Sequence, residues 1–252
     1  MTDTSMLKIV TRTREMRILS SLNTLLQGVP ASGRATLDAV LEGIRALFSG
    51  DRETRRRVAF SVAVIALSAK MAKADGIVTV EEVAAFQQIL EIPPEEMRNV
   101  FRLYDLAKQD IAGFEAYAAR LRGLCRDEDG DCALLGDVLD GLFHIAKADG
   151  LVHERELAFL SEVGRIFGLT DAEFARIRDR HIRGPDDPYA VLGLEPDTAP
   201  EEARARYLTL VKENHPDRLA SRGVPDEFMF IANERMKAIN AAYGQIAGKT
   251  AA

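Results

Sequence analysis

A seven-residue segment that occurs twice constrains the fold of this chain more than any other feature. Residues 72–78 (AKADGIV) recur as residues 146–152 (AKADGLV), at an offset of 74 residues. Each copy follows an apolar run with helical spacing and precedes another, so the pattern predicts two helix–turn–helix units, each built on an Asp-Gly turn. The four predicted helical runs are Val58 to Met71, Glu81 to Leu90, Ala133 to Ile145 and Glu154 to Phe167.

Helical periodicity extends over almost the whole chain, and no segment shows a convincing strand pattern. We therefore predict an all-α fold. The segment Gly184-Pro185-Asp186-Asp187-Pro188 interrupts the helical pattern and predicts a domain boundary. The predicted parts are an N-terminal helical leader at 1–57, a helical bundle with an internal repeat at 58–184, and a small helical hairpin domain at 185–252.

Charge and hydropathy argue against a nucleic-acid partner and against a membrane-spanning segment. The chain has a net charge of -6, and although residues 1–57 carry 10 Lys and Arg against 6 Asp and Glu, they offer few aromatic rings for stacking on bases. The longest nearly uncharged apolar stretch, Val58 to Ala69, is about half the roughly 20 residues that a membrane span needs. No signal-peptide pattern is present. We expect no nucleic-acid partner, no transmembrane segment and a cytoplasmic location.

Each copy of the repeat places an Asp-Gly pair ahead of a glutamate. The four carboxylates are Asp75, Glu82, Asp149 and Glu156. Oxygen ligands of this kind suit calcium or magnesium, but positions 1 and 3 of an EF-hand loop carry no carboxylate in either copy, so neither loop is a complete EF-hand. A structural interpretation stands beside the metal site: the two glycines permit tight turns, and the two glutamates cap the helices that follow.

The paired Lys-Ala-Asp-Gly-x-Val…Glu units in an all-helical domain resemble the TerB-like, tellurite-resistance-associated family. In that family, matching acidic residues of the two repeats are thought to converge on a metal. The resemblance therefore implies a site for a divalent cation, calcium or magnesium, formed by Asp75, Glu82, Asp149 and Glu156. The turn-and-cap interpretation of the same residues remains open.

The C-terminal region is organised around His215-Pro216-Asp217. This tripeptide ends a helix-patterned run, Glu201 to Asn214, and opens a predicted loop, Arg218 to Val224, before a second run, Glu227 to Ile246. Upstream, the segment from Asp187 to Leu194 predicts a short helix ended by Gly193, and Thr198 to Glu201 predicts a capping box for the first long helix.

The two long C-terminal runs carry apolar stripes that can face each other in an antiparallel pair. Proline stops the first helix and stiffens the turn, so His215 and Asp217 form a rigid polar tip at the end of the hairpin. The predicted stripe residues are Ala203, Tyr207, Leu210 and Val211 on the first helix, and Phe228, Ala232, Met236, Ile239, Tyr243 and Ile246 on the second.

A helix–HPD–helix hairpin that follows an Asp-Pro-Tyr-x-Val-Leu-Gly start resembles the J domain of DnaJ-type proteins. The order of the two regions looks most like that of DjlA-type co-chaperones, which place a J domain behind a TerB-like domain. The resemblance implies a DnaK-type ATPase as partner, and no catalytic residue in this chain. The residues that it implies in partner binding are His215, Pro216, Asp217, Arg204, Arg206, Tyr207, Lys212 and Arg218.

Two departures from the DjlA-type pattern affect the expected function. DjlA-type proteins usually begin with a transmembrane helix, which we do not predict here. In addition, Leu208, Thr209 and Glu213 stand where J domains tend to carry basic residues.

The leading hypothesis is a co-chaperone whose TerB-like domain recruits clients, self-associates, binds a metal or localises the activity. The alternative is a metal-binding stress-response protein that uses the J domain as an interaction module. An enzyme is not expected, because no nucleophile–base pair or complete ligand set is recognisable.

Overall fold

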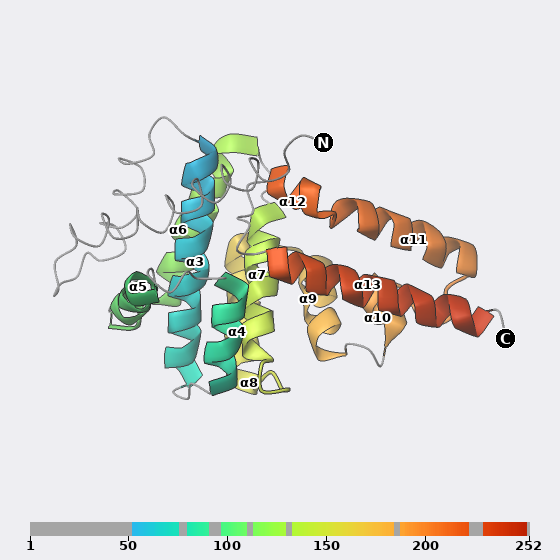
Figure 1. Ribbon diagram of the computed structural model, residues 1–252, viewed down its shortest axis with the longest axis horizontal. Coiled ribbons are helices and arrows are strands. Elements are labelled where there is room, and N and C mark those ends of the chain that lie inside the picture. The colour runs from blue at the N-terminus through green and yellow to red at the C-terminus, as the bar shows by residue number, and fades with distance from the viewer. Residues whose placement is uncertain are drawn as a thin grey trace, which may run out of the picture.

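A computed structural model describes residues 52–75, 80–90, 97–109, 113–129, 133–183, 187–221 and 229–250 (Figure 1). Across these ranges every regular element is a helix, which confirms the predicted all-α fold. The N-terminal leader lies outside the described residues apart from its last few positions. The helices are α3 (Arg52–Asp75), α4 (Val80–Leu90), α5 (Met97–Gln109), α6 (Phe114–Asp129), α7 (Ala133–Ala146), α8 (Glu154–Phe167), α9 (Asp171–Ile182), α10 (Pro188–Leu192), α11 (Pro200–Glu213), α12 (Pro216–Ser221) and α13 (Met229–Thr250).

Helices α3 to α9 form a bundle around α3 and α7. Every residue of α3 from Ser61 to Ala72 is buried, so this part of the helix is enclosed by its neighbours on all sides. Helix α3 contacts α5, α6, α7 and α8, and Phe143 of α7 lies fully buried in the shared core. The two predicted helix–turn–helix units are α3–α4 and α7–α8. In the second unit Gly150 has a φ of 100°, which explains the glycine of this Asp-Gly turn.

The C-terminal hairpin consists of α11 and α13, which run antiparallel with α10 packed against them (Figure 1). Asp187 begins α10 by accepting a hydrogen bond from the Ala190 backbone N–H at 3.0 Å, and Gly193 ends it in the left-handed region with a φ of 68°. The short helix and the glycine that ends it agree with the sequence prediction. The apolar residues of the hairpin form a second, smaller core: Val191, Leu192, Ala203, Leu210, Ile239, Ala242 and Ile246.

Three local predictions for this region are wrong. Ala199 rather than Thr198 is the N-cap of α11, because the Thr198 hydroxyl instead donates back to the Glu195 carbonyl at 2.6 Å. Residues Arg218 to Ser221, which were predicted as loop, belong to helix α12, which begins at Pro216 because proline suits the first position of a helix. Ala232 packs in the bundle core together with Leu219 and Ile231, so the start of α13 belongs to the bundle rather than to the hairpin stripe.

Within the described part of the chain, none of the helices combines the length and the apolar character that crossing a membrane requires.

Candidate functional site

The HPD motif forms the N-terminus of α12 at the tip of the hairpin. The His215 carbonyl accepts hydrogen bonds from the backbone N–H groups of Arg218 and Leu219 at 2.9 and 3.1 Å. Its ring Nδ1 accepts from the Asp217 N–H at 3.3 Å and lies 3.6 Å from the Asp217 carboxylate. The side chains of His215 and Asp217 are nevertheless 56% and 93% exposed. The backbone is thus fixed locally while both polar groups face solvent.

An exposed stripe on α11 leads toward this tip. Arg204, Leu208 and Lys212 follow one another at intervals of four residues, and all three are exposed. Leu208, at 55% exposure, is one of the few large apolar side chains in the described residues that face water. Sequence reasoning counted Leu208 only as a missing basic residue. Leu208 therefore adds an apolar group to a face that otherwise carries Arg204 and Lys212.

The other residues predicted to bind a partner have different environments. Arg206 Nε donates to the Leu192 carbonyl at 3.0 Å and so ties α11 to the end of α10. The Tyr207 ring stacks on Tyr243 with centroids 4.2 Å apart, and its hydroxyl donates to Asn240 at 3.0 Å. Arg218 is exposed on α12. Arg206 and Tyr207 therefore hold the hairpin together, whereas Arg204, Lys212 and Arg218 lie at its surface.

The structure brings together two of the four repeat carboxylates, one from each copy. Glu82 of α4 and Glu156 of α8 are hydrogen bonded to each other, and the Glu156 residue is only 2% exposed. Burial raises the pKa of Glu156 to about 7, and the Glu82 charge and hydrogen bond add to this rise. The His153 backbone N–H, which donates to Glu156 at 2.9 Å, acts in the opposite direction. Near neutral pH this carboxyl pair can hold one proton between its two groups or bind a cation.

Asp149 is engaged within its own turn. Its carboxylate accepts from the Leu151 N–H at 3.1 Å and lies 3.2 Å from Nε2 of His153. These hydrogen bonds lower the pKa of Asp149. Asp75 is the last residue of α3, and its side chain lies outside the described set. Among the side chains that are described, no group of three or more His, Cys, Asp or Glu residues is arranged to hold a metal ion.

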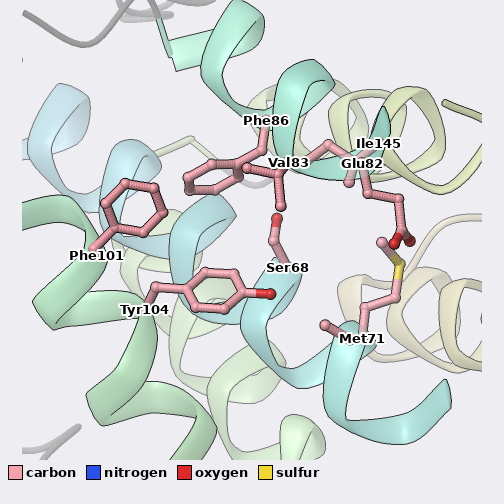
Figure 2. A pocket seen from close by; sticks show the side chains of 9 residues that line it. Ser68, Met71, Glu82, Val83, Phe86, Phe101, Tyr104 and Ile145 are labelled. Carbon is pink, nitrogen blue, oxygen red and sulfur yellow. The ribbon is translucent and has the colours of Figure 1, made fainter. Parts of the chain in front are cut away.

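Glu82 also borders a small apolar cavity of about 60 Å³ between α3, α4 and α5 (Figure 2). Met71, Phe86 and Tyr104 contribute to its wall. Burial, followed by the charges of Glu82 and Asp105, raises the pKa of Tyr104 to about 12. The surroundings of the first-repeat carboxylate are therefore largely apolar, which disfavours placing two full negative charges on the carboxyl pair.

A buried ionic cluster between the bundle and the hairpin was not predicted from the sequence. Arg235 of α13 binds Asp137 and Asp140 of α7, and it also contacts Asn214, the residue before His215. These groups are up to 98 residues apart in the chain. Each one alone has the appearance of an ordinary polar position on a helix, so no local signal could have identified the cluster.

The chain is similar to one protein family and to several curated proteins. The family model described as tellurite resistance protein TerB matches residues 61–179. A protein named co-chaperone protein DjlA from Photobacterium profundum is 28% identical over 218 residues, covering 76% of this chain and 78% of that protein. A protein of the same name from Coxiella burnetii is 27% identical over 197 residues, covering 70% of this chain and 72% of that protein. A third, from Haemophilus ducreyi, is 42% identical over 65 residues, a quarter of this chain and 23% of its own length. No solved structure matches the chain.

Proposed function

We propose that this chain, which is similar to co-chaperone proteins named DjlA, is a co-chaperone that stimulates ATP hydrolysis by a DnaK-type chaperone through the HPD motif. The observation that carries the proposal is the exposure of His215 and Asp217 at a tip whose backbone is held by local hydrogen bonds. A rigid, solvent-facing polar tip loses little conformational entropy when a partner binds it.

The chemistry of the tip and of the α11 stripe indicates how the partner would be recognised. Asp217 offers a carboxylate for a cationic group, and His215 offers a ring nitrogen. Arg204 and Lys212 would steer an acidic surface toward α11, and Leu208 would be buried in the contact. By binding more tightly to the hydrolysis-competent conformation of the partner, the chain would accelerate hydrolysis without carrying out a bond-breaking step itself.

Single-turnover ATP hydrolysis by a DnaK-type ATPase, with increasing concentrations of the full chain, tests this proposal. His215→Gln should raise the half-maximal concentration by about 30-fold, the effect of losing a contact of about 2 kcal/mol at the centre of an interface. His153→Gln, at another exposed histidine, is the matched control and should behave like the wild type. Absence of stimulation by the wild type, or equal stimulation by His215→Gln, would reject the co-chaperone assignment.

A second candidate function, binding of calcium or magnesium by the bundle, is favoured by the meeting of Glu82 and Glu156. Both carboxylates come from equivalent positions of the repeat, and a divalent cation would remove the repulsion that keeps one of them protonated. A cation site and a proton-sharing pair are thus alternative states of the same two side chains, and protons should compete with the metal.

Isothermal titration calorimetry of the full chain with calcium, magnesium and manganese at pH 8 distinguishes these states. Binding by the wild type that is lost in Glu156→Gln and kept in Glu154→Gln would support the metal site. Glu154 is a suitable control because it lies exposed in the same first turn of α8. If the wild type gives no binding heat with any of the three ions at several temperatures, the metal function is excluded.

A further inference from the structure

Arg235 joins the C-terminal hairpin to the helical bundle at a buried position. Its Nη1 donates to the Asp137 carboxylate at 2.8 Å, and its Nη2 and Nε donate to one oxygen of Asp140 at 2.8 and 3.0 Å. Arg235 is 8% exposed and Asp140 only 1%. A guanidinium that is hydrogen bonded to two carboxylates in this way has a fixed position and a fixed orientation.

The bundle holds Asp140 from its other side as well. Arg180 Nη2 and His181 Nε2, both on α9, lie 2.7 and 2.9 Å from the second carboxylate oxygen. Burial alone would raise the pKa of Asp140, but Arg180 and Arg235 hold it well below the usual range. Burial lowers the pKa of His181 to about 4, so near neutral pH its ring is an uncharged donor. The two aspartates and two arginines of the cluster therefore balance in formal charge.

The same guanidinium reaches the HPD motif through one residue. Arg235 Nη1 donates to Oδ1 of Asn214 at 2.9 Å, and Nδ2 of Asn214 donates to the Leu210 carbonyl at 2.7 Å, which closes the last turn of α11. Asn214 is buried and directly precedes His215. On the other side of the motif, Leu219 is buried in the bundle core. The exposed His215 and Asp217 are thus bracketed by two residues that are anchored to the bundle.

The other contacts between bundle and hairpin include the packing of α9 against α10, and a pocket lies next to them. A cavity of about 360 Å³ lies beside the ion cluster, with walls from α7, α9, α10 and α13 that include His144, Pro188 and Ala238. The ion cluster, the α9–α10 contact and the buried residues Leu219 and Ile231 together join the hairpin to the bundle.

We propose that the bundle positions the HPD motif for its partner, with Asp137, Asp140 and Arg235 as positioning residues that act through Asn214. The inference rests on the proposed co-chaperone function and adds a role for the bundle in it. None of these four residues needs to touch the partner. Their effect is to hold the backbone on which His215 and Asp217 are presented.

Asp137→Asn in the full chain tests the positioning role, because it removes one charge from the cluster and keeps the shape of the side chain. We expect the half-maximal concentration for stimulating a DnaK-type ATPase to rise about fivefold, which lies within the range known for coupling through packed side chains. The rate at saturating concentration should stay unchanged. Asn240→Ala is the matched control. It removes the hydrogen bond from Tyr207 that joins α11 to α13 away from the bundle, and it should leave the half-maximal concentration unchanged.

Amide hydrogen exchange gives a readout that does not require the chaperone. The N–H groups of Arg218 and Leu219 donate to the His215 carbonyl, so a loosened motif should exchange them about fivefold faster in Asp137→Asn and not in Asn240→Ala. A merely stabilising role of Asp137 would lower the urea midpoint and leave both this local exchange and the half-maximal concentration unchanged. That result would overturn the inference.

Asn214→Ala keeps the inference testable if Asp137→Asn does not fold, because it removes the bridging amide and leaves all four ionised groups in place. It should show the same shift in half-maximal concentration and the same faster exchange, and wild-type values in both would overturn the proposal. If the wild type fails to stimulate the ATPase, the co-chaperone function alone is rejected. The exchange measurement then decides whether the bundle orders the motif.

Discussion

Replacing Glu156 with glutamine should stabilise the protein at pH 8 much more than at pH 5. The Glu156 carboxyl is buried against Glu82, and burial together with that second carboxylate raises its pKa to about 7. Glutamine has almost the same shape as protonated glutamate. It can still accept the hydrogen bond from the His153 backbone N–H and donate one to Glu82.

The direction of the effect follows from the raised pKa in the folded state. Below the ordinary value of 4.5 the carboxyl is protonated in both the folded and the unfolded chain, and its stabilising contribution is complete. As the pH rises from 4.5 to about 7, the unfolded chain loses its proton first, so the free energy of unfolding falls. At about 1.4 kcal/mol per pKa unit, the loss over this window is about 3 kcal/mol at most. Glu156→Gln does not titrate and avoids this loss.

Urea denaturation followed by circular dichroism, from pH 5 to pH 8.5, measures the difference between the two proteins at each pH. Glu154→Gln is the control, because it removes an exposed carboxylate from the same helical turn. The free energies of wild type and Glu156→Gln should diverge as the pH increases and reach a constant difference above about pH 8. Parallel curves for the two proteins would refute the conclusion that Glu156 holds a proton in the folded state.

Two further predictions concern helix ends. Thr170→Ala should lower the free energy of unfolding by about 1 kcal/mol, because the Thr170 hydroxyl is the N-cap of α9 and accepts a hydrogen bond from the Glu173 N–H. Thr198→Ala should lower it clearly less, because the Thr198 hydroxyl donates to the Glu195 carbonyl and does not cap α11. Equal urea midpoints for these two variants would contradict the assignment of the caps. Gly193→Ala should cost about 1 to 2 kcal/mol, because the residue has a φ of 68° and an added Cβ would lie 3.1 Å from the Arg176 side chain. Fast amide exchange in α10 of this variant would locate the damage, and a wild-type urea midpoint would show that the turn tolerates a side chain.

Features that depend on neighbouring residues were predictable from the sequence. The Asp-Gly turn of the second repeat copy and the glycine that ends α10 are both determined within a few positions of the chain. The HPD motif was recognised for the same reason. Where several local solutions compete, prediction failed: Thr198 could cap α11 or bond back to Glu195, and the sequence alone does not rank the two.

Features that depend on how the two regions pack were not predictable. Ala232 falls on the apolar stripe of α13 at helical spacing, yet the first turns of that helix extend into the bundle core beside Leu219. Periodicity identifies which residues are buried but not which core receives them. Similarly, the proximity of Glu82 and Glu156 was expected only from the family resemblance, because their contact requires α4 and α8 to approach each other in space.

The position of the ion cluster also determines which face of the hairpin stays open. Arg235 lies on α13 and Asn214 at the end of α11, so the bundle occupies the α13 side of the hairpin tip. Arg204, Leu208 and Lys212 lie on the exposed face of α11, and their exposure is not reduced by the bundle. A partner could therefore bind the α11 face and the HPD tip without separating the two regions. For this reason we expect variants that loosen the cluster to weaken stimulation of the ATPase. If the bundle instead covered the HPD tip, the same variants would strengthen stimulation.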